Sequence, residues 1–183
     1  MARKESITKE ILSDGAFKLL REQGDDMLTA RKLASYIGCS TQPIFRIYEG
    51  MEELSADMFT KARLFYESFC LDYVKVSEVP FVDLALCYIK FAKAEPNLFK
   101  LLFLKSHNDE NTMYDIINGK ENGFVIKELK SIKNLDMNNA GMIFMKVFVF
   151  MHGMACMVIN GEFDLDDDET KEMLMDVISG FIA

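Results

Sequence analysis

Proline, histidine and paired cysteine are scarce in this sequence, and each scarcity excludes a class of protein. The chain has three prolines, no stretch rich in Ser, Gly and Pro, and a composition that is half hydrophobic, which excludes a largely disordered protein. Two histidines and four cysteines without metal-type spacing give no ligand set for a closed zinc site. With 183 residues, the chain is long enough for one or two small domains with a real hydrophobic core.

The four cysteines fall within apolar patterns, which is typical of reduced thiols in a cytosolic protein. We therefore expect no disulfide among Cys39, Cys70, Cys87 and Cys156. The residues after Met1 are charged and amphipathic and lack the apolar core of a secretory signal. The expected location is the cytoplasm.

Basic residues are outnumbered, since 21 Lys and Arg stand against 29 Asp and Glu and give a net charge of −8. The imbalance is uneven, because residues 1–50 hold eight basic and seven acidic residues and the acidic excess lies in the remainder. At physiological salt, repulsion from distant charges is screened beyond about 8 Å. The first 50 residues are thus compatible with a nucleic-acid partner, through only a few phosphate contacts.

Residues 28–54 have the pattern of two short helices joined by a turn. Apolar residues at helical spacing give the first helix one buried face, and the small Ala34 allows the second helix to approach closely. Gly38 permits the left-handed backbone that ends a helix. Ser40 is the expected N-cap of the second helix, whose first turn holds Pro43. The pattern predicts a helix-turn-helix, a motif that places the N-terminal end of its second helix in the major groove of DNA.

An ordered series within the first 54 residues carries a resemblance to a known family: Ile7, Ile11, Ala16, Phe17, Leu20, Gly24, Leu33, Ala34, Gly38, Cys39, Ser40, Ile44, Phe45, Ile47, Tyr48 and Leu54. It resembles the tetracycline-repressor (TetR/AcrR) family of bacterial transcriptional regulators, whose pattern runs through Gly-Val-Ser, Leu-Tyr, His-Phe and Lys-x-x-Leu. The resemblance implies an all-α fold, with a three-helix DNA-binding head followed by a helical domain for effector binding and dimerisation. We place these two domains at residues 1–50 and 51–183.

Three positions depart from the family pattern. Phe45 stands where the family has a tyrosine that donates its hydroxyl to a phosphate, Ile47 where it often has histidine, and Met51 where it has a phosphate-contacting lysine. Each departure removes a contact that positions the protein on the duplex. We expect affinity, more than sequence preference, to be affected.

Base-edge contact is expected from the outward N-terminal side of the second helix, where Thr41, Gln42 and Arg46 lie, while Ile44 and Phe45 face inward or toward the backbone. Gln pairs with adenine and Arg with guanine in the major groove. Thr29 and Lys4 are candidates for phosphate contact, although Thr29 also suits an N-cap and Arg46 a solvated charge. The candidate DNA-binding residues are Lys4, Thr29, Thr41, Gln42, Pro43, Phe45 and Arg46.

Beyond residue 51, apolar residues at helical spacing predict helix after helix, with no convincing strand and no internal repeat. Pro80 and Pro96 each lie near a proposed helix start. The expected helices cover residues 52–76, 81–94, 96–105, 109–133 (as one helix or two), 140–159 and 166–181.

Residues 140–159 are apolar on every side, which is typical of a membrane span or of a helix buried on two faces. Lys146 and His152 would each need a partner in lipid, which argues against a span. This helix and the final one resemble the last two helices of TetR-type proteins, which form a four-helix interface between two subunits. We expect a homodimer through these helices and no membrane association.

The 13 methionines and 15 phenylalanines suit a pocket for a small apolar effector, because Met adapts to irregular shapes and Phe supplies contact area. The alternative for each of these side chains is an ordinary place in the core. Helical phase and the location of the family's pockets select Phe65, Phe69, Phe91, Phe103, Met145, Phe148 and His152 as candidates.

Other chemistry is sparse. His152 and Cys156 lie four residues apart and could offer two zinc ligands or a nucleophile and its base, but a packed His152 with a hydrogen-bonded neighbour is favoured. The other histidine, His107, has no neighbouring cysteine. The acidic run at 164–168 lacks the glycine and glutamate of a calcium loop, so a solvated turn at a helix start is the better account. We predict no metal, no cofactor and no enzymatic activity.

The sequence thus predicts a cytoplasmic homodimeric transcriptional regulator, a repressor, that binds a near-palindromic operator in double-stranded DNA and is released by a small apolar effector. A helix that follows the second helix of the motif with almost no loop would couple the body to the head. Two alternatives stay open. The head could pair with protein rather than DNA, which would explain Phe45, Ile47 and Met51, or the chain could be an enzyme, although no catalytic constellation is found.

Overall fold

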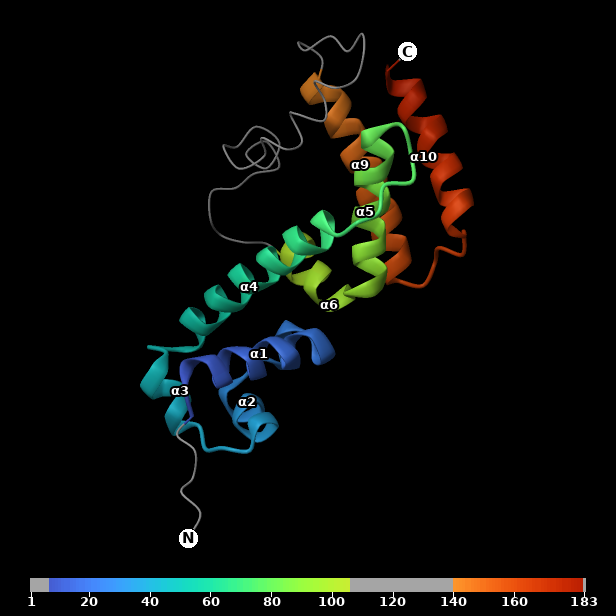
Figure 1. Ribbon diagram of the computed structural model, residues 1–183. Helices are drawn as coiled ribbons and strands as arrows, with labels where there is room; N and C mark the ends of the chain where they lie inside the picture. The colour runs from blue at the N-terminus through green and yellow to red at the C-terminus, as the bar shows by residue number, and fades with distance from the viewer. Residues whose placement is uncertain (1–6, 106–139, 183) are drawn as a thin grey trace. The chain divides into compact units, whose positions relative to one another are not determined.

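The computed structural model describes residues 7–105 and 140–182, and all regular structure in these ranges is helical (Figure 1). The predicted all-α class is confirmed. The helix expected at 109–133, together with Lys4 and His107, lies outside the described residues. The elements are α1 (Lys9–Gln23), η1 (Asp25–Met27), α2 (Ala30–Ile37), α3 (Gln42–Ile47), α4 (Met51–Leu71), α5 (Pro80–Ala94), α6 (Pro96–Phe99), η2 (Lys100–Leu104), α9 (Ala140–Ile159) and α10 (Asp167–Ile182).

These residues pack into two compact units. The first holds residues 7–69 and 95–105, and the second holds residues 70–94 and 140–182. The chain passes from the first to the second in the last turn of α4. The units divide the chain by packing, so the functional boundary expected after residue 50 stays a prediction.

Local signals set the ends of α1 and its close packing on α2. The side-chain oxygen of Thr8 accepts a hydrogen bond from the Ile11 N–H at 3.3 Å, and Gly24 ends the helix with a φ of 86°. A Cβ added at Gly15 would lie 2.4 Å from Cγ2 of Ile37, so only glycine lets the two helices come this close. The fully buried side chains of the first unit include Leu12, Ala16, Leu20, Leu33, Ile44, Leu54, Met58 and Ala62.

The second unit is built from α5, α9 and α10, and Figure 1 shows α5 and α9 packed side by side. By length and composition alone, residues Gly141–Ile159 could cross a membrane, a property that core helices of soluble proteins share. In this unit α9 buries one face, which consists of Phe144, Val147, Phe148, Met151, Met154 and Ala155.

The helix predicted over residues 52–76 ends earlier, at Leu71. Asp83 holds the far end of the segment that follows, because its Oδ1 accepts hydrogen bonds from the N–H groups of Val76 at 2.8 Å and Ser77 at 3.1 Å. These groups bond to α5 instead of continuing α4. The β-branched valines of this segment also disfavour a helix.

The helix predicted over residues 96–105 is not regular. Its first part is the single turn of α6, and η2 is a wider turn in which the Lys105 N–H donates to the Lys100 carbonyl at 3.0 Å. This five-residue hydrogen bond is the mark of a π-type turn.

The acidic run before α10 starts that helix. The Oδ1 atom of Asp166 accepts hydrogen bonds at 2.9 Å from the N–H groups of Asp168 and Glu169, and Glu169 Oε2 accepts from the Asp166 N–H at 3.0 Å. This reciprocal pair is a capping box. The interpretation of these acids as part of a helix start is confirmed, and α10 begins one residue after the expected position because Asp166 is its cap.

Candidate nucleic-acid interface

The first helix of the motif, α2, is fixed at both ends by the residues that the sequence indicated. Thr29 is its N-cap and accepts from the Lys32 N–H at 3.3 Å. Gly38 follows it in the left-handed region, with φ 72° and ψ 33°. The Cys39 N–H donates to the Ala34 carbonyl at 2.9 Å, which completes a Schellman motif and sets the direction of the turn.

The second helix, α3, starts differently from the prediction. Ser40 is not its cap, because Thr41 precedes the first helical residue and has a helical backbone without a side-chain cap hydrogen bond. Pro43 lies in the first turn, as expected. The hydroxyl of Thr41 is therefore not used by a cap and is exposed.

The side chains of α3 divide into a buried and an exposed face. Ile44 is fully buried, while Thr41, Gln42 and Arg46 are exposed. Phe45 does not face inward, since 54% of its surface is exposed. The helix therefore presents two polar groups, a guanidinium and an aromatic ring to a partner.

Arg46 has an internal partner in this structure. Its Nη2 atom donates a hydrogen bond to the carbonyl of Ile7, the second residue before α1, at 3.0 Å. The guanidinium is thus held against the backbone of the segment that precedes α1. To read a base edge, it must exchange this hydrogen bond for one to DNA.

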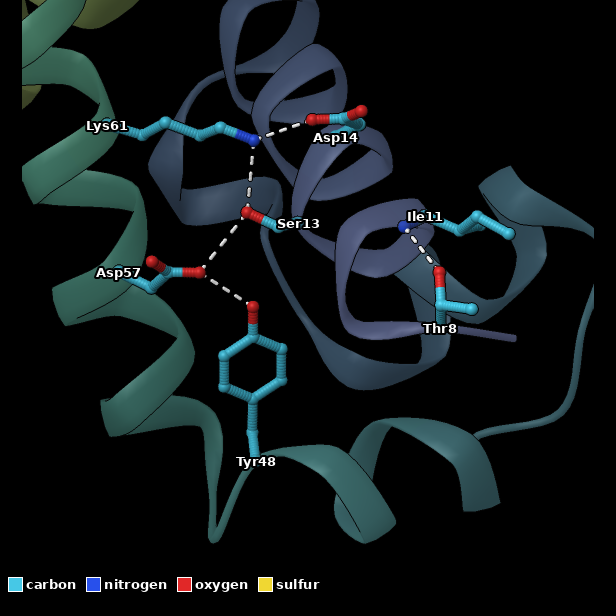
Figure 2. A network of polar contacts seen from close by, with 7 residues as sticks. All are labelled: Thr8, Ile11, Ser13, Asp14, Tyr48, Asp57 and Lys61. Atoms are coloured by element: carbon cyan, nitrogen blue, oxygen red, sulfur yellow. Dashed lines mark hydrogen bonds and ion pairs between the residues drawn. The ribbon is translucent and has the colours of Figure 1, made fainter. Parts of the chain in front are cut away.

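A network of polar side chains joins α1, the end of α3 and α4 (Figure 2). The Tyr48 hydroxyl donates to Asp57 Oδ2 at 2.6 Å, and the Ser13 hydroxyl donates to the same oxygen at 3.2 Å. Lys61 donates to Ser13 Oγ at 3.1 Å and pairs with Asp14 at 2.6 Å. Tyr48, the residue that follows α3, is therefore bonded to α4 directly and linked to α1 through Asp57.

The electrostatics of this network follow from burial and pairing. Burial and the hydrogen bond to Asp57 raise the pKa of Tyr48, so its hydroxyl stays a donor at neutral pH. The hydrogen bond and the charge of Lys61 lower the pKa of Asp14. Sequence reasoning missed this network, although Ser13 and Asp57 each stand in phase with the buried residues of their helix, a pattern that marks a paired polar group.

No protein-family model and no curated protein matches this sequence. The structure is similar to the crystal structure of a TetR-like transcriptional regulator from Rhodococcus sp. RHA1, with a TM-score of 0.66. The match covers 94% of this chain and 96% of that chain at 11% sequence identity. The chain has a TetR-like fold.

Within this TetR-like fold, the effector candidates fall into both packing units. Phe65, Phe69 and Phe103 belong to the first unit, where the ring of Phe65 packs against Phe17 at 5.8 Å and the guanidinium of Arg21 lies 4.7 Å from its centre. These contacts give Phe65 a role in packing α4 on α1. The candidates in the second unit are Phe91, Met145, Phe148 and His152.

Two of the second unit's candidates meet on one face of α9. The Phe148 ring stacks on the His152 ring at 5.5 Å, and the Tyr88 hydroxyl lies 2.8 Å from His152 Nδ1. Burial lowers the pKa of His152, so the ring is neutral at pH 7 and Nδ1 can accept from Tyr88. The predicted hydrogen-bonded neighbour of His152 is thus confirmed and is Tyr88, which is buried on α5.

Proposed function

We propose that this protein is a sequence-specific DNA-binding transcriptional regulator, a cytoplasmic homodimeric repressor that a small apolar ligand releases from its operator. The observation that carries the proposal is the exposed face of α3, held by a Schellman turn on one side and the Asp57 network on the other. A rigid short helix with outward polar side chains is what reading of the major groove requires. The TetR-like fold supports the same conclusion.

The contacts we assign to DNA are few. Gln42 and Arg46 read base edges, with Thr41 beside them at the start of α3. The exposed Thr29 contacts a phosphate, and we assign a second phosphate contact to Lys4, while Pro43 and Phe45 pack against the sugar-phosphate surface. Phe45 has no hydroxyl to donate, and the Tyr48 hydroxyl is engaged by Asp57. The salt dependence of binding is therefore expected to be modest.

The last two described helices, α9 and α10, form the dimer interface in this proposal. The face of α9 opposite to the buried one carries Met142, Val149 and Met157, which are 63%, 63% and 43% exposed. Met173 of α10 is 39% exposed. Exposed apolar side chains on two packed helices are typical of an interface between subunits. A dimer with twofold symmetry has two equal heads, which match the two halves of a near-palindromic operator.

Release by an effector rests on the chain between α3 and α5. Only Tyr48, Glu49 and Gly50 separate α3 from α4, and α4 runs without interruption to the second unit. A ligand near Phe148 and His152 that shifts the second unit would therefore act on the head through one helix. The aromatic stack suits an apolar ligand, and the pair formed by Tyr88 and His152 suits one polar group on it.

The deciding experiment selects bound fragments from random duplex DNA with the full-length protein and measures their affinity at several salt concentrations. Arg46→Ala is expected to weaken binding by about 1 to 3 kcal/mol and to relax preference at one operator position. Met51→Lys is expected to restore a phosphate contact and to steepen the salt slope by about one unit. Recovery of no enriched sequence would refute the proposal, and uniform weakening by Arg46→Ala would make Arg46 a phosphate contact.

A second function, recognition of a protein by the same head, is favoured by one observation. The Phe45 ring is exposed on α3, and exposed aromatic side chains are enriched where proteins bind proteins. Phe45→Tyr separates the two functions, because a restored hydroxyl strengthens DNA binding but adds nothing to an apolar protein contact. If Phe45→Tyr leaves DNA affinity unchanged while Phe45→Ala abolishes capture of a protein partner, the second function holds.

A further inference from the structure

Two cysteines from different elements meet in the second unit. Cys70 lies in the last turn of α4 and Cys87 in the middle of α5, and the Cys87 thiol donates a hydrogen bond to Cys70 Sγ across 3.3 Å. Disulfide sulfurs lie about 2 Å apart, so bond formation requires the two sulfurs to approach each other by about 1 Å.

The two thiols differ in exposure, and the pKa of the Cys87 thiol is raised. Cys87 is 3% exposed, whereas Cys70 is half-buried. The hydrogen bond to Cys70 and burial raise the pKa of Cys87, and the nearby Lys90 ammonium acts in the opposite direction. Cys70 is thus the sulfur that a small solute reaches first, and Cys87 is a protonated neighbour already directed at it.

We propose that Cys70 and Cys87 are a reversible redox pair, which a hydroperoxide converts into an intramolecular disulfide that joins the end of α4 to α5. Disulfides in cytosolic proteins, where they occur, are usually transient and redox-sensing. The oxidation of the two thiols does not depend on DNA binding. Its regulatory consequence, a change in operator affinity, rests on the proposed function.

The reaction balances as a two-electron oxidation. The Cys70 thiolate attacks the terminal oxygen of the hydroperoxide, so that an S–O bond forms, the O–O bond breaks and the alcohol leaves with a proton. The Cys87 sulfur then attacks the sulfenic sulfur of Cys70, an S–S bond forms, and the hydroxyl group leaves as water with the Cys87 proton. Two thiols are oxidised, one hydroperoxide is reduced, and a dithiol reductant reverses the change.

The position of the pair gives the disulfide its mechanical effect. α4 follows the DNA-reading helix at one end and carries Cys70 at the other. A covalent link between this end and α5 limits the orientations that α4 can take relative to the second unit. Cys70 also lies at a helix C-terminus, which disfavours a thiolate, so oxidation is expected to be slower than in a dedicated peroxidase.

The chemical test is a peptide map of the full-length reduced protein treated with hydrogen peroxide. Trypsin releases Cys70 in the peptide 64–75 and Cys87 in the adjacent peptide 76–90. We expect one disulfide-linked species that is lighter than the two peptides by two hydrogen atoms and that dithiothreitol splits. Two separate peptides, or linkage to Cys39, Cys156 or a second chain, would overturn the inference.

Variants sharpen this test. The double variant Cys39→Ser and Cys156→Ser keeps the pair and is expected to give the same linked species, whereas Cys70→Ser gives none. Cys87→Ser is expected to leave a sulfenic acid on Cys70 that dimedone traps. Because Cys87 is buried, its folding is checked by circular dichroism, with Cys87→Ala as a second variant.

The regulatory test compares operator affinity of the reduced and the oxidised protein. We expect oxidation to change affinity by about fivefold or more, the lower end of usual allosteric coupling, and to have no effect on Cys70→Ser. Equal operator affinities of the reduced and the oxidised protein would refute the regulation. The peptide map would then decide separately whether the disulfide forms. If the reduced protein binds no DNA, the proposed function and its regulation are refuted. The disulfide is still tested by the peptide map.

Discussion

The hydroxyl of Tyr48 donates a 2.6 Å hydrogen bond to the carboxylate of Asp57, and this contact joins the end of α3 to the second turn of α4 (Figure 2). Tyr48 is 1% exposed, so its hydroxyl has no water to replace this partner. This buried hydroxyl therefore helps to fix the position of α3 relative to α4. A movement of α4 reaches α3 through this contact and the short connection beside it, and reaches α1 through the bonds of Asp57 and Lys61.

We predict that Tyr48→Phe lowers the free energy of unfolding by about 1.5 to 3 kcal/mol, the usual range for a hydrogen bond to a charged group. Tyr36→Phe is the matched control, because the Tyr36 hydroxyl donates to a carboxylate of Glu22 at 3.0 Å on the exposed surface. That control is expected to leave stability unchanged. Urea denaturation followed by circular dichroism measures the stability of both variants. If the two variants lose equal stability, burial of the Tyr48 hydroxyl is not the cause of the loss.

The close crossing of α1 and α2 gives a second prediction. Gly15→Ala gains about 1 kcal/mol of helix propensity but places a Cβ against the methyl group of Ile37, and overpacking of this kind costs about 1 to 3 kcal/mol. We expect a net loss of stability. The second change Ile37→Leu removes the branched methyl group and should restore most of it. Gly180→Ala in α10, where a new Cβ meets nothing within 4 Å, is the control and should not destabilise.

The features that could be predicted from the sequence are those set by neighbouring residues. Thr29, Gly24 and Gly38 act at helix ends through groups within a few residues, so their roles could be read from local spacing. The same holds for the bounds of α9, which the sequence placed at 140–159 as the structure does. The all-α class follows from such elements because most of them carry their own apolar periodicity, and α9 is recognised by the length of its apolar run.

The features that could not be predicted depend on pairs far apart in the chain. Ser13 and Asp57 are 44 positions apart, and Tyr88 and His152 are 64 apart. The non-helical segment after α4 likewise depends on Asp83, which accepts backbone hydrogen bonds from Val76 and Ser77, outside its own helix. A polar residue in the phase of a buried face indicates that a partner exists, but not which residue supplies it.

Dimerisation is tested at the exposed face of α9. Val158 near the end of α9 is half-buried, whereas Val149 is 63% exposed. We predict that Val149→Arg yields monomers in sedimentation experiments, because a charge in an apolar interface loses its hydration. Leu64→Arg on α4, at a site of 53% exposure, is the control and should leave the dimer intact. A dimer that survives Val149→Arg would place the interface elsewhere.

His152 makes stability depend on pH. Its pKa is lowered in the folded protein by burial, so below the ordinary value of 6.5 the unfolded chain binds a proton that the folded ring resists. Stability is therefore full above pH 6.5 and falls as the pH decreases below it, by at most about 1.4 kcal/mol per pH unit for one group. Denaturation curves between pH 7.5 and about 5.5 should show this fall in the wild type and in His107→Gln, and lose it in His152→Gln. An unchanged fall in His152→Gln would assign it to other groups.

The last prediction concerns release of the operator by an apolar ligand. A ligand shifts the protein from the DNA-bound state only if it binds the released state more tightly, and the usual coupling is about 1 to 3 kcal/mol. Phe148 is 6% exposed and stacks on His152, so Phe148→Trp adds bulk beside the His152 ring, while Met145→Trp adds bulk at a half-buried position on the same helix. We expect these variants to change the effect of apolar compounds on operator affinity and to leave the dimer intact.

The measurement is operator affinity of each variant with and without a panel of apolar compounds, together with the effect of these compounds on the melting temperature. If both tryptophan variants respond as the wild type does, or if no apolar compound raises the melting temperature, then Phe148 and Met145 are ordinary core residues and release has another trigger.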